Sequence, residues 1–443
     1  MPAWLLKSYQ AFVLFEDARL DSSTTATRSF PAAHESWAVL SHQMHRPSQP
    51  LKIAQVVFSL QPGGMENGVV NLANHMPESQ ALTTFLCLEE AGAFAERLKP
   101  GVNVQTLGRR PGWDWRACWR LASALRHLMP DVIHTHNLGP LIYATTARLL
   151  FPTLWRVPIL HGEHGALQGD GLLPRRLRQR RRLYQRCQIV HTVSDGLRQE
   201  LIAHGMPAEK MVSILNGVDC DRFRPTSNLR EARLKAGLPE NAFVLGAVGR
   251  FIATKRYLLL VETFEILASA NPDCHLMILG DGGAERELVQ ERIRQSPFAG
   301  RIHTLGHQAE PAPFYQAMDI LVMPSSHEGL ANALLEAMAS GVPVLAHAAC
   351  GAGEVVQNNV SGFLAKINSA AELAGRIQSL MAQPGLLSLV SQNARESART
   401  KFSLASMVHN YLEVFRHVSA CVPASLSALS STSTEPHSLE CGE

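Results

Sequence analysis

The sequence lacks a continuous apolar run of the roughly 18–20 residues that a helix needs to cross a bilayer. A short apolar stretch at the N-terminus is interrupted by Lys7, acidic residues follow it, and no small-residue cleavage site is evident. We therefore expect neither a membrane-spanning helix nor a secretory signal, and we expect a cytoplasmic protein.

Paired cysteines and a dinucleotide-binding fingerprint are also absent. The eight cysteines are scattered and none forms a CxxC pair, which fits reduced thiols better than a disulfide framework or a zinc site. No GxGxxG motif follows the first strand pattern, so a dinucleotide-dependent oxidoreductase loses support.

The length and the charge distribution point to two domains. A chain of 443 residues is too long for one typical core. Residues 1–230 carry 26 Lys and Arg against 18 Asp and Glu, whereas the remainder carries 15 against 20. The basic first half predicts contact with an anionic surface or substrate.

Short apolar runs alternate with helical patterns along the chain, in two series. The first series comprises residues 52–60, 82–88, 131–136, 157–162, 188–194 and 211–217, and the second comprises 243–250, 275–283, 301–306, 319–324 and 342–346. Such spacing predicts βαβ units with buried parallel sheets. The fold class is therefore α/β with two Rossmann-like domains, and a ligand is expected at the carboxyl ends of the strands, in a cleft between them.

Two glutamates, Glu328 and Glu336, stand eight residues apart in PSSHEGLANALLEAMASGVPVLA. The first follows an apolar strand and the second lies inside a helix pattern. A strand, a short loop and a helix N-terminus present free backbone N–H groups to an anion, and the glutamates can accept hydrogen bonds from hydroxyls. A sugar nucleotide carries both kinds of group. A well-formed helix with no ligand is the alternative reading of the pair alone.

Cations and glycines stand at the first strand-to-helix turn of each domain. Arg250 and Lys255 follow the first strand of the second series and can hold a diphosphate, although two solvated surface cations would look the same. Gly63 and Gly64 occupy the equivalent turn of the first domain, where a missing Cβ lets the backbone approach a phosphate. Two glycines are equally compatible with a plain loop.

Histidines end a strand of the first series in ILHGEHG. His161 or His164 can hydrogen-bond a sugar or stabilise developing charge there. The spacing also permits a metal site, but no cysteine or carboxylate cluster completes one, so no metal is expected.

Seven arginines crowd the segment LPRRLRQRRRLYQR, residues 173–186. Leu173, Leu177 and Tyr184 form a narrow apolar stripe at helical spacing, which is typical of a basic amphipathic helix on a membrane surface. A solvated helix face is the plain alternative. No aromatic platform accompanies the arginines, so nucleic acid is not expected as a partner.

Together these motifs resemble retaining glycosyltransferases of family 4 with the GT-B architecture, over residues 50–418. The strongest match is EGLANALLEAMASGVPVLA, followed by GRFIATK, LGDGG, LGHQ and NGVDCDRFRP. GGMENGVVNLAN, HGEHG and VSDGL are most similar to bacterial exopolysaccharide sugar transferases associated with PEP-CTERM systems. One departure is CGAGE at 350–354, where the family often has a double glycine before a glutamate; this leaves the ligand contact of that loop open.

Residues 1–49 are rich in Ser, Thr, Pro and His without a sustained period, and the end of the chain is rich in Ser and Thr, so we expect a disordered extension at 1–49 and a disordered tail at 419–443. For the rest, the resemblance implies an acceptor domain at 50–222, a donor domain at 223–401 and a helix at 402–418 that packs back on the first domain.

The resemblance also implies roles for the site residues. Arg250 and Lys255 would neutralise the donor diphosphate, Glu328 would hold donor-sugar hydroxyls, Glu336 would bind the ribose diol, and His164 would be the active-site histidine. The other residues expected to contact substrate are Gly63, Gly64, His161, Leu305, Gly306, His307, Gly329, Leu330, Ala331 and Asn332.

The function implied is hexosyl transfer from a nucleotide-diphosphate sugar to a hydroxyl acceptor, with retention and without a metal or other cofactor. The acceptor would be a lipid-linked intermediate of exopolysaccharide or cell-surface glycan synthesis, which would place the enzyme at the inner face of the cell membrane. A sugar-nucleotide epimerase of the same architecture and a catalytically silent scaffold of a polysaccharide assembly remain as alternatives. The sequence names neither the donor base and sugar nor the oligomeric state.

Overall fold

The computed structural model describes residues 49–167, 169–326, 330–348 and 351–420. Nearly all of the expected extension and tail, residues 1–49 and 419–443, therefore lie outside the described residues, as do Glu328 and Gly329. Within the described part of the chain, no helix is both long enough and apolar enough to cross a membrane.

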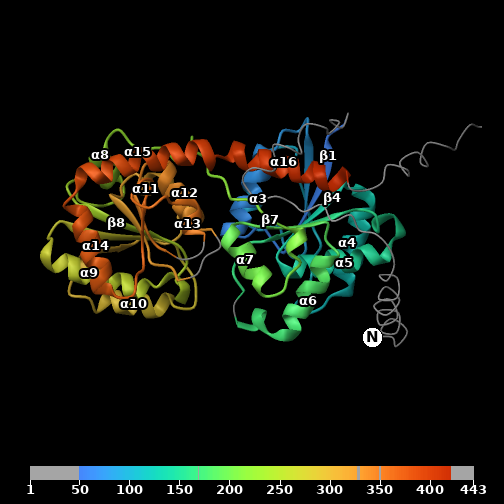
Figure 1. Cartoon of the computed structure of the whole chain (residues 1–443), viewed down its shortest axis with the longest axis horizontal. Coiled ribbons are helices and arrows are strands. Elements are labelled where there is room, and N and C mark those ends of the chain that lie inside the picture. Colours follow the sequence, from blue (N-terminus) through green and yellow to red (C-terminus); the bar gives the residue numbers. More distant parts are fainter. Residues whose placement is uncertain (1–48, 168, 327–329, 349–350, 421–443) are drawn as a thin grey trace, which may run out of the picture. The chain divides into compact units, whose positions relative to one another are not determined.

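The first part of the chain folds around a seven-stranded parallel sheet with the strand order β3-β2-β1-β4-β5-β6-β7 (Figure 1). Its strands are β1 (Leu51–Val57), β2 (Ala81–Cys87), β3 (Asn103–Thr106), β4 (Val132–His136), β5 (Ile159–Glu163), β6 (Ile189–Thr192) and β7 (Met211–Ser213). The connecting helices are α3 (Gly64–His75), α4 (Trp115–Leu128), α5 (Leu138–Leu150), α6 (Pro174–Gln185) and α7 (Asp195–Ala203), with short 3₁₀ turns η2 (Ala93–Arg97), η3 (Pro152–Leu154), η4 (Gly169–Leu172) and η5 (Ala208–Lys210).

The second part folds around a six-stranded parallel sheet with the order β10-β9-β8-β11-β12-β13. Its strands are β8 (Phe243–Val248), β9 (Cys274–Leu279), β10 (Ile302–Thr304), β11 (Ile320–Met323), β12 (Val344–His347) and β13 (Phe363–Ala365). The helices are α8 (Leu229–Lys235), α9 (Tyr257–Ala270), α10 (Arg286–Arg294), α11 (Ala312–Tyr315), α12 (Asn332–Ala339), α13 (Ala352–Val355), α14 (Ala370–Met381) and α15 (Pro384–Lys401), with turns η6 (Ala253–Lys255) and η7 (Ala299–Arg301).

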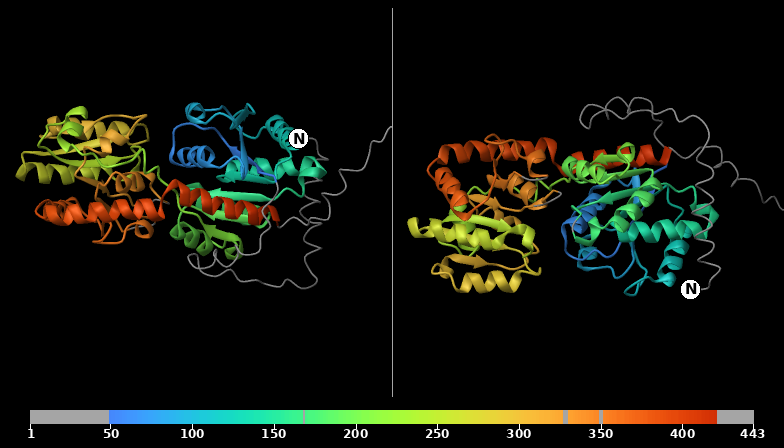
Figure 2. Two further views of the ribbon diagram at one scale, coloured as in Figure 1. Left: turned by 90° about the horizontal axis from the view of Figure 1, so that it is seen from above. Right: turned by 60° about the horizontal axis from the view of Figure 1, so that its bottom comes forward.

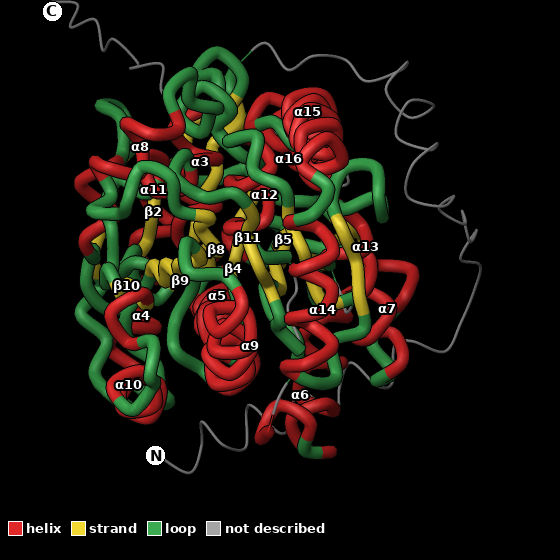
Figure 3. Tube along the Cα trace, turned by 90° about the vertical axis from the view of Figure 1, so that its left-hand side faces the viewer, coloured by secondary structure: helices red, strands yellow, loops and turns green. Residues whose placement is uncertain are grey.

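Helices cover both faces of the second sheet (Figure 3), so its strands are apolar at successive positions. Along β11, Ile320 and Val322 pack in the core beneath α9 and α14, whereas Leu321 and Met323 pack in the core beneath α12. Because successive side chains of a strand point to opposite faces, burial on both sides requires the near-continuous apolar run that the sequence shows.

Helix α16 (Leu404–Ala420) returns to the first sheet after α15 (Figure 2). It contacts α3, β4 and β5, and its inner face buries Tyr411 and Phe415. Together with α3, this helix covers the sheet face opposite to α4, α5 and α6.

The predicted α/β class with two parallel, Rossmann-like sheets is confirmed. Two strands, β3 and β13, were not predicted. Both are short edge strands, of four and three residues, and β3 exposes Asn103 and Gln105.

Candidate active site

Glycines bring three strand ends of the second sheet together. Gly280, after β9, has φ +126°, and a Cβ there would lie 2.2 Å from the carbonyl oxygen of Gly249, after β8. The N–H of Gly280 donates to the carbonyl oxygen of Gly306, after β10, at 2.8 Å. Only glycine fits such close contact at this φ. The segment Leu305–His307 therefore lies against the ends of β8 and β9.

Two backbone carbonyl oxygens of this segment already accept hydrogen bonds within the protein. The carbonyl oxygen of Leu305 accepts from Gln308 at 2.6 Å, and that of Gly306 accepts from Gly280. Each carbonyl keeps one lone pair for a base, while His307 is exposed.

Arg250 and Lys255 lie at the end of β8, as predicted from their positions after a strand. Arg250 is exposed and Lys255 is half-buried. A Cβ on Gly249 would lie 2.8 Å from Cε of Lys255, so the lysine stem folds over the backbone at the strand end. Both cations are therefore at the carboxyl edge of the sheet, where ligands of open α/β sheets bind.

Glu336 lies one turn into α12, and its carboxylate accepts a hydrogen bond from the Tyr315 hydroxyl at 2.8 Å. Burial raises the pKa of Glu336, while the Tyr315 bond and the more distant Arg222 and Arg97 lower it. Of the preceding residues, Leu330 and Ala331 are buried, which leaves mainly their backbone to face a ligand.

Gly63 and Gly64 begin α3, where the side chain of Asn332 meets them. Asn332 Nδ2 donates to the carbonyl oxygen of Gly64 at 3.0 Å, and its amide oxygen accepts from Asn216 at 2.9 Å. The side chain of Glu66 folds back toward Gly63. Burial raises its pKa, whereas Arg250 lowers it. Glu66 was not identified from the sequence.

His161 and His164 lie on opposite faces of the first sheet. His161 is fully buried, its Nδ1 is 2.8 Å from Thr135 Oγ1, and its Nε2 is 3.3 Å from Glu163 Oε1. Both of its ring nitrogens are thus engaged, so no ring nitrogen of His161 faces a ligand. Glu163 also accepts from Tyr184 at 2.5 Å.

His164 belongs to a hydrogen-bond chain on the other face. Its Nε2 lies 2.9 Å from Nδ1 of His136, and Nε2 of His136 lies 2.7 Å from the amide oxygen of Gln55. That oxygen can only accept, so His136 carries its proton on Nε2 and accepts from His164 Nε2–H at Nδ1. Nδ1 of His164 is consequently a bare acceptor. Burial lowers the pKa of His164 to about 4, which keeps the ring neutral.

Gly162 makes room for this chain. A Cβ at Gly162 would lie 2.5 Å from His191 Nε2 and 3.0 Å from His164 Nε2. The glycine of the HGEHG motif is therefore required by the side chains beside it. Gln55 and His136 were not identified from the sequence, although His134 and His136 alternate in a buried strand and so share one face.

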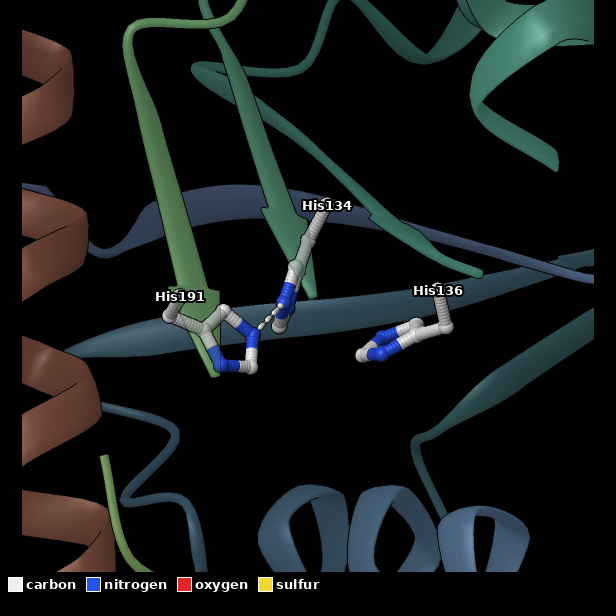
Figure 4. Close-up of side chains that lie close together, drawn as sticks. All are labelled: His134, His136 and His191. Carbon is white, nitrogen blue, oxygen red and sulfur yellow. Dashed lines mark hydrogen bonds between the residues drawn. The ribbon is translucent and has the colours of Figure 1, made fainter. Parts of the chain in front are cut away.

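The three buried histidines His134, His136 and His191 are the described residues that could hold a metal ion, with nitrogens within 4.8 Å of one another (Figure 4). Their present hydrogen bonds compete with that use. His134 and His191 face each other through Nε2 at 2.9 Å, and both nitrogens of His136 are engaged. The Nδ1 atoms of His134 and His191 also lack, among the described residues, the hydrogen-bond acceptor that normally orients a metal-binding histidine.

Two family profiles match this chain. The profile described as Glycosyltransferase Family 4 matches residues 62–222, and the profile described as Glycosyl transferases group 1 matches residues 229–397. The chain belongs to glycosyltransferase family 4 and has the GT-B fold.

Relatives and solved structures agree with this placement of the glycosyltransferase. It is 25% identical to the Escherichia coli UDP-Gal:alpha-D-GlcNAc-diphosphoundecaprenol alpha-1,3-galactosyltransferase, over 82% of this chain and 96% of that protein. It is 27% identical to the capsular polysaccharide biosynthesis glycosyltransferase CapM of Staphylococcus aureus, over 50% of this chain and 61% of CapM. The match to Rhizobium meliloti LpsE, at 30% identity, covers 41% of this chain and 52% of LpsE. The chain thus spans little more than half the length of these last two.

Anabaena HepE, solved in complex with UDP and glucose, aligns with a TM-score of 0.73 at 23% identity, over 82% of this chain and 99% of HepE. Sucrose-phosphate synthase from Thermosynechococcus elongatus aligns with a TM-score of 0.71 at 20% identity, over 84% of this chain and all of that one. These likenesses show the fold of the glycosyltransferase.

The arginine-rich helix of the glycosyltransferase differs from its predicted pattern at two positions. Arg180 is buried, with Nη2 3.5 Å from Glu163 Oε1, so it belongs to the interior and not to the basic face. Leu173, expected in the apolar stripe, is exposed. The inner face of α6 is instead Arg180, Leu183 and Tyr184. The other six arginines are exposed.

Glu354 ends the CGAGE sequence, in which this glycosyltransferase departs from the family pattern, and it hydrogen-bonds to another part of the same chain. Its carboxylate accepts from the backbone N–H groups of Asp195 at 2.5 Å and Gly196 at 2.6 Å. These groups open α7, where free N–H donors and the helix dipole favour an anion. This glutamate therefore binds a helix N-terminus within the chain.

Proposed function

We propose that this glycosyltransferase moves a hexosyl group from a nucleotide-diphosphate sugar to a hydroxyl acceptor with retention at the anomeric carbon. The observation that carries the proposal is the site at the carboxyl edge of the second sheet. There Arg250 and Lys255 end β8, the segment Leu305–His307 closes against it, and Glu336 follows β11. Cations, backbone acceptors and a carboxylate are the groups that a diphosphate, a base and a ribose diol require.

Each residue has a role in the proposed reaction. Arg250 and Lys255 neutralise the leaving diphosphate, and Glu336 accepts from the ribose hydroxyls. Glu328 would hold donor-sugar hydroxyls with the amides of Gly329 to Asn332, and Gly64 would leave space for the diphosphate. His164 accepts a hydrogen bond from a sugar hydroxyl at its unprotonated Nδ1. The relay through His136 supports this last role, because it leaves that lone pair available.

The transfer itself needs no protein nucleophile. The acceptor oxygen forms a bond to the anomeric carbon while the bond from that carbon to the diphosphate oxygen breaks. The electron pair leaves with the nucleoside diphosphate, and the acceptor proton passes to the departing phosphate on the same face of the sugar. Arg250 and Lys255 stabilise the charge that develops there. We propose that these cations act without a metal ion.

The acceptor that we propose is a lipid-linked intermediate in polysaccharide or cell-surface glycan assembly, of the kind made in exopolysaccharide systems associated with PEP-CTERM sorting. The name of the Escherichia coli relative states a diphosphoundecaprenol-linked acceptor and UDP-Gal as donor. The five exposed arginines of α6, with the exposed Arg186 directly after it, fit an anionic surface. We accordingly propose a cytoplasmic enzyme that is peripheral at the inner membrane face.

A thermal-shift screen against nucleoside diphosphates and their sugars, with EDTA throughout, tests the donor part. A ligand that binds the folded state raises the melting temperature, so one nucleotide sugar should stabilise the protein without a metal. Proton NMR of the product then reads the anomeric configuration. No shift with any nucleotide would count against the donor site, and an inverted product would count against retention.

A further inference from the structure

All four tryptophans of the described residues lie in the first domain, either on α4, just before it, or at the end of η3. Trp113, Trp115, Trp119 and Trp155 are 46%, 38%, 59% and 56% exposed. Large aromatic rings are usually well buried in a globular protein, and a group of exposed ones marks an interaction site.

Ring contacts link part of this group, and the packing of η3 against α4 brings the rest near it. Trp115 and Trp119 are four residues apart on α4 and so share its outer face. Trp113 lies 5.3 Å from Trp115, between ring centroids, and Trp119 lies 6.1 Å from Phe151. Trp155 ends the turn η3, which contacts α4. The tryptophan surface therefore consists of the start and outer face of α4 together with the end of η3.

The tryptophan surface is surrounded by positive charge. Residues 107–158 contain seven arginines against two acidic residues, Asp114 and Asp131. The exposed arginines are Arg110, Arg116, Arg120, Arg126 and Arg156. Asp114 caps α4 and lies 3.7 Å from Arg120. In the described part of the chain, no carboxylate pairs with Arg116, Arg126 or Arg156.

We propose that this tryptophan surface binds the headgroup region of an anionic lipid bilayer. Tryptophan prefers the membrane–water interface because its ring is apolar and its indole N–H is polar, and arginines beside it attract anionic headgroups. Exposed arginines outnumber carboxylates in residues 107–158, so the charge of this segment complements an anionic headgroup. The surface lies on the sheet face that α4, α5 and α6 cover, opposite His136 and His164, and it is built from α4 and η3 and not from the arginines of α6.

The proposal stands independently of the transfer reaction, and vesicle binding tests it on the full chain. The probes are vesicles of phosphatidylcholine alone and of phosphatidylcholine with phosphatidylglycerol. The wild type should sediment with the anionic vesicles. Trp119→Ser with Trp155→Ser, and separately Arg116→Ser with Arg156→Ser, should each lower the partition coefficient about tenfold or more. Leu288→Ser with Leu389→Ser is the matched control, because these leucines of α10 and α15 are each 55% exposed.

Tryptophan fluorescence supplies a readout that sedimentation does not. Anionic vesicles should shift the emission of the wild type to the blue, and brominated lipid should quench it, whereas the Trp119→Ser, Trp155→Ser variant should lose most of both effects. Melting temperatures equal to that of the wild type establish folding. The proposal is overturned if the wild type binds no vesicle, if the tryptophan variant binds like the control, or if only serines at Arg175, Arg176 and Arg178 of α6 reduce binding.

Discussion

At the scale of single residues, His136 decides where the ring of His164 carries its proton. Gln55 accepts from His136, and His136 accepts from His164. We predict that Gln55→Leu lowers kcat by about 10-fold, the scale of one hydrogen bond, with little change in the donor KM. Without the amide oxygen, His136 can carry its proton on Nδ1, and His164 then has to present an N–H to the sugar.

The conservative variant separates positioning from packing. Gln55→Glu keeps an acceptor at the same place and should keep most of kcat, and ¹⁵N NMR of the histidines should show the wild-type tautomers. A control is His303→Asn, which removes a similar pair in the second domain, His275 Nδ1 and His303 Nε2 at 3.0 Å. If Gln55→Leu and Gln55→Glu lose activity equally, the relay has no part in the reaction.

Lys255 gives a second residue-scale prediction. Lys255→Ala should weaken nucleoside diphosphate binding about 10–100-fold, because one charge-assisted contact is lost. Isothermal titration calorimetry with the nucleoside diphosphate measures this directly. Lys235→Ala is the control, since Lys235 pairs only with neighbouring Glu231 on an exposed face of α8. Equal affinity in the Lys255→Ala variant would remove Lys255 from the donor site.

The sequence correctly predicted which residues follow a strand. It did not predict which residues from different elements form hydrogen bonds with one another. Arg250 and Lys255 were assigned to a strand end from their position alone, and they lie there. Gln55 and His136 are 81 residues apart and meet only because β1 and β4 are neighbours in the sheet. Nothing local in an apolar strand marks Gln55 as a hydrogen-bond partner. Arg180 was assigned to the surface for the same reason, since its partner Glu163 is on another element.

At the scale of elements, α16 packs against the buried histidines His134 and His191 of the first sheet and stabilises that part of the domain. The ring of Phe415 lies 5.5 Å from His134, and that of Tyr411 lies 5.2 Å from His191. Phe415 is fully buried. Phe415→Ala should therefore cost about 3–5 kcal/mol of unfolding free energy, measured as a lower urea midpoint. Leu389→Ala, on the exposed face of α15, should change it by less than about 0.5 kcal/mol. A midpoint unchanged by Phe415→Ala would mean that α16 packs loosely.

The elements themselves were largely predictable because both sheets are buried on two sides. The eleven apolar runs all became strands, and the helix predicted in NALLEAMA matches α12. The two missed strands are at sheet edges, where one neighbour is absent and fewer side chains need be apolar. An apolar run predicts a strand only where the strand is buried, so edge strands are the ones that it can miss.

At the scale of the whole molecule, the buried histidines make stability depend on pH. Burial, with the repulsion of neighbouring rings, lowers the pKa of His134, His136 and His191 well below its usual range, and it lowers that of His164 to about 4. The unfolded chain takes up a proton on each near pH 6.5, whereas the folded chain does not. Stability is therefore fully present above pH 6.5 and falls as the pH drops below it.

The size of this effect can be measured. Each histidine that stays neutral in the folded chain should remove roughly 1 kcal/mol of unfolding free energy between pH 7 and pH 5.5, so the group should remove several kcal/mol. The carboxyl groups of Glu66, Glu336 and Asp319, whose pKa burial raises, act in the opposite direction. Urea denaturation across this range should show the loss. His134→Gln with His191→Gln should make the loss smaller, because two buried histidines no longer titrate, while His275, His303 and His417, whose pKa burial also lowers, remain in both proteins. A loss as steep in that variant as in the wild type would mean that other groups bind the protons, and a flat profile in the wild type would mean that the histidines titrate in the folded state.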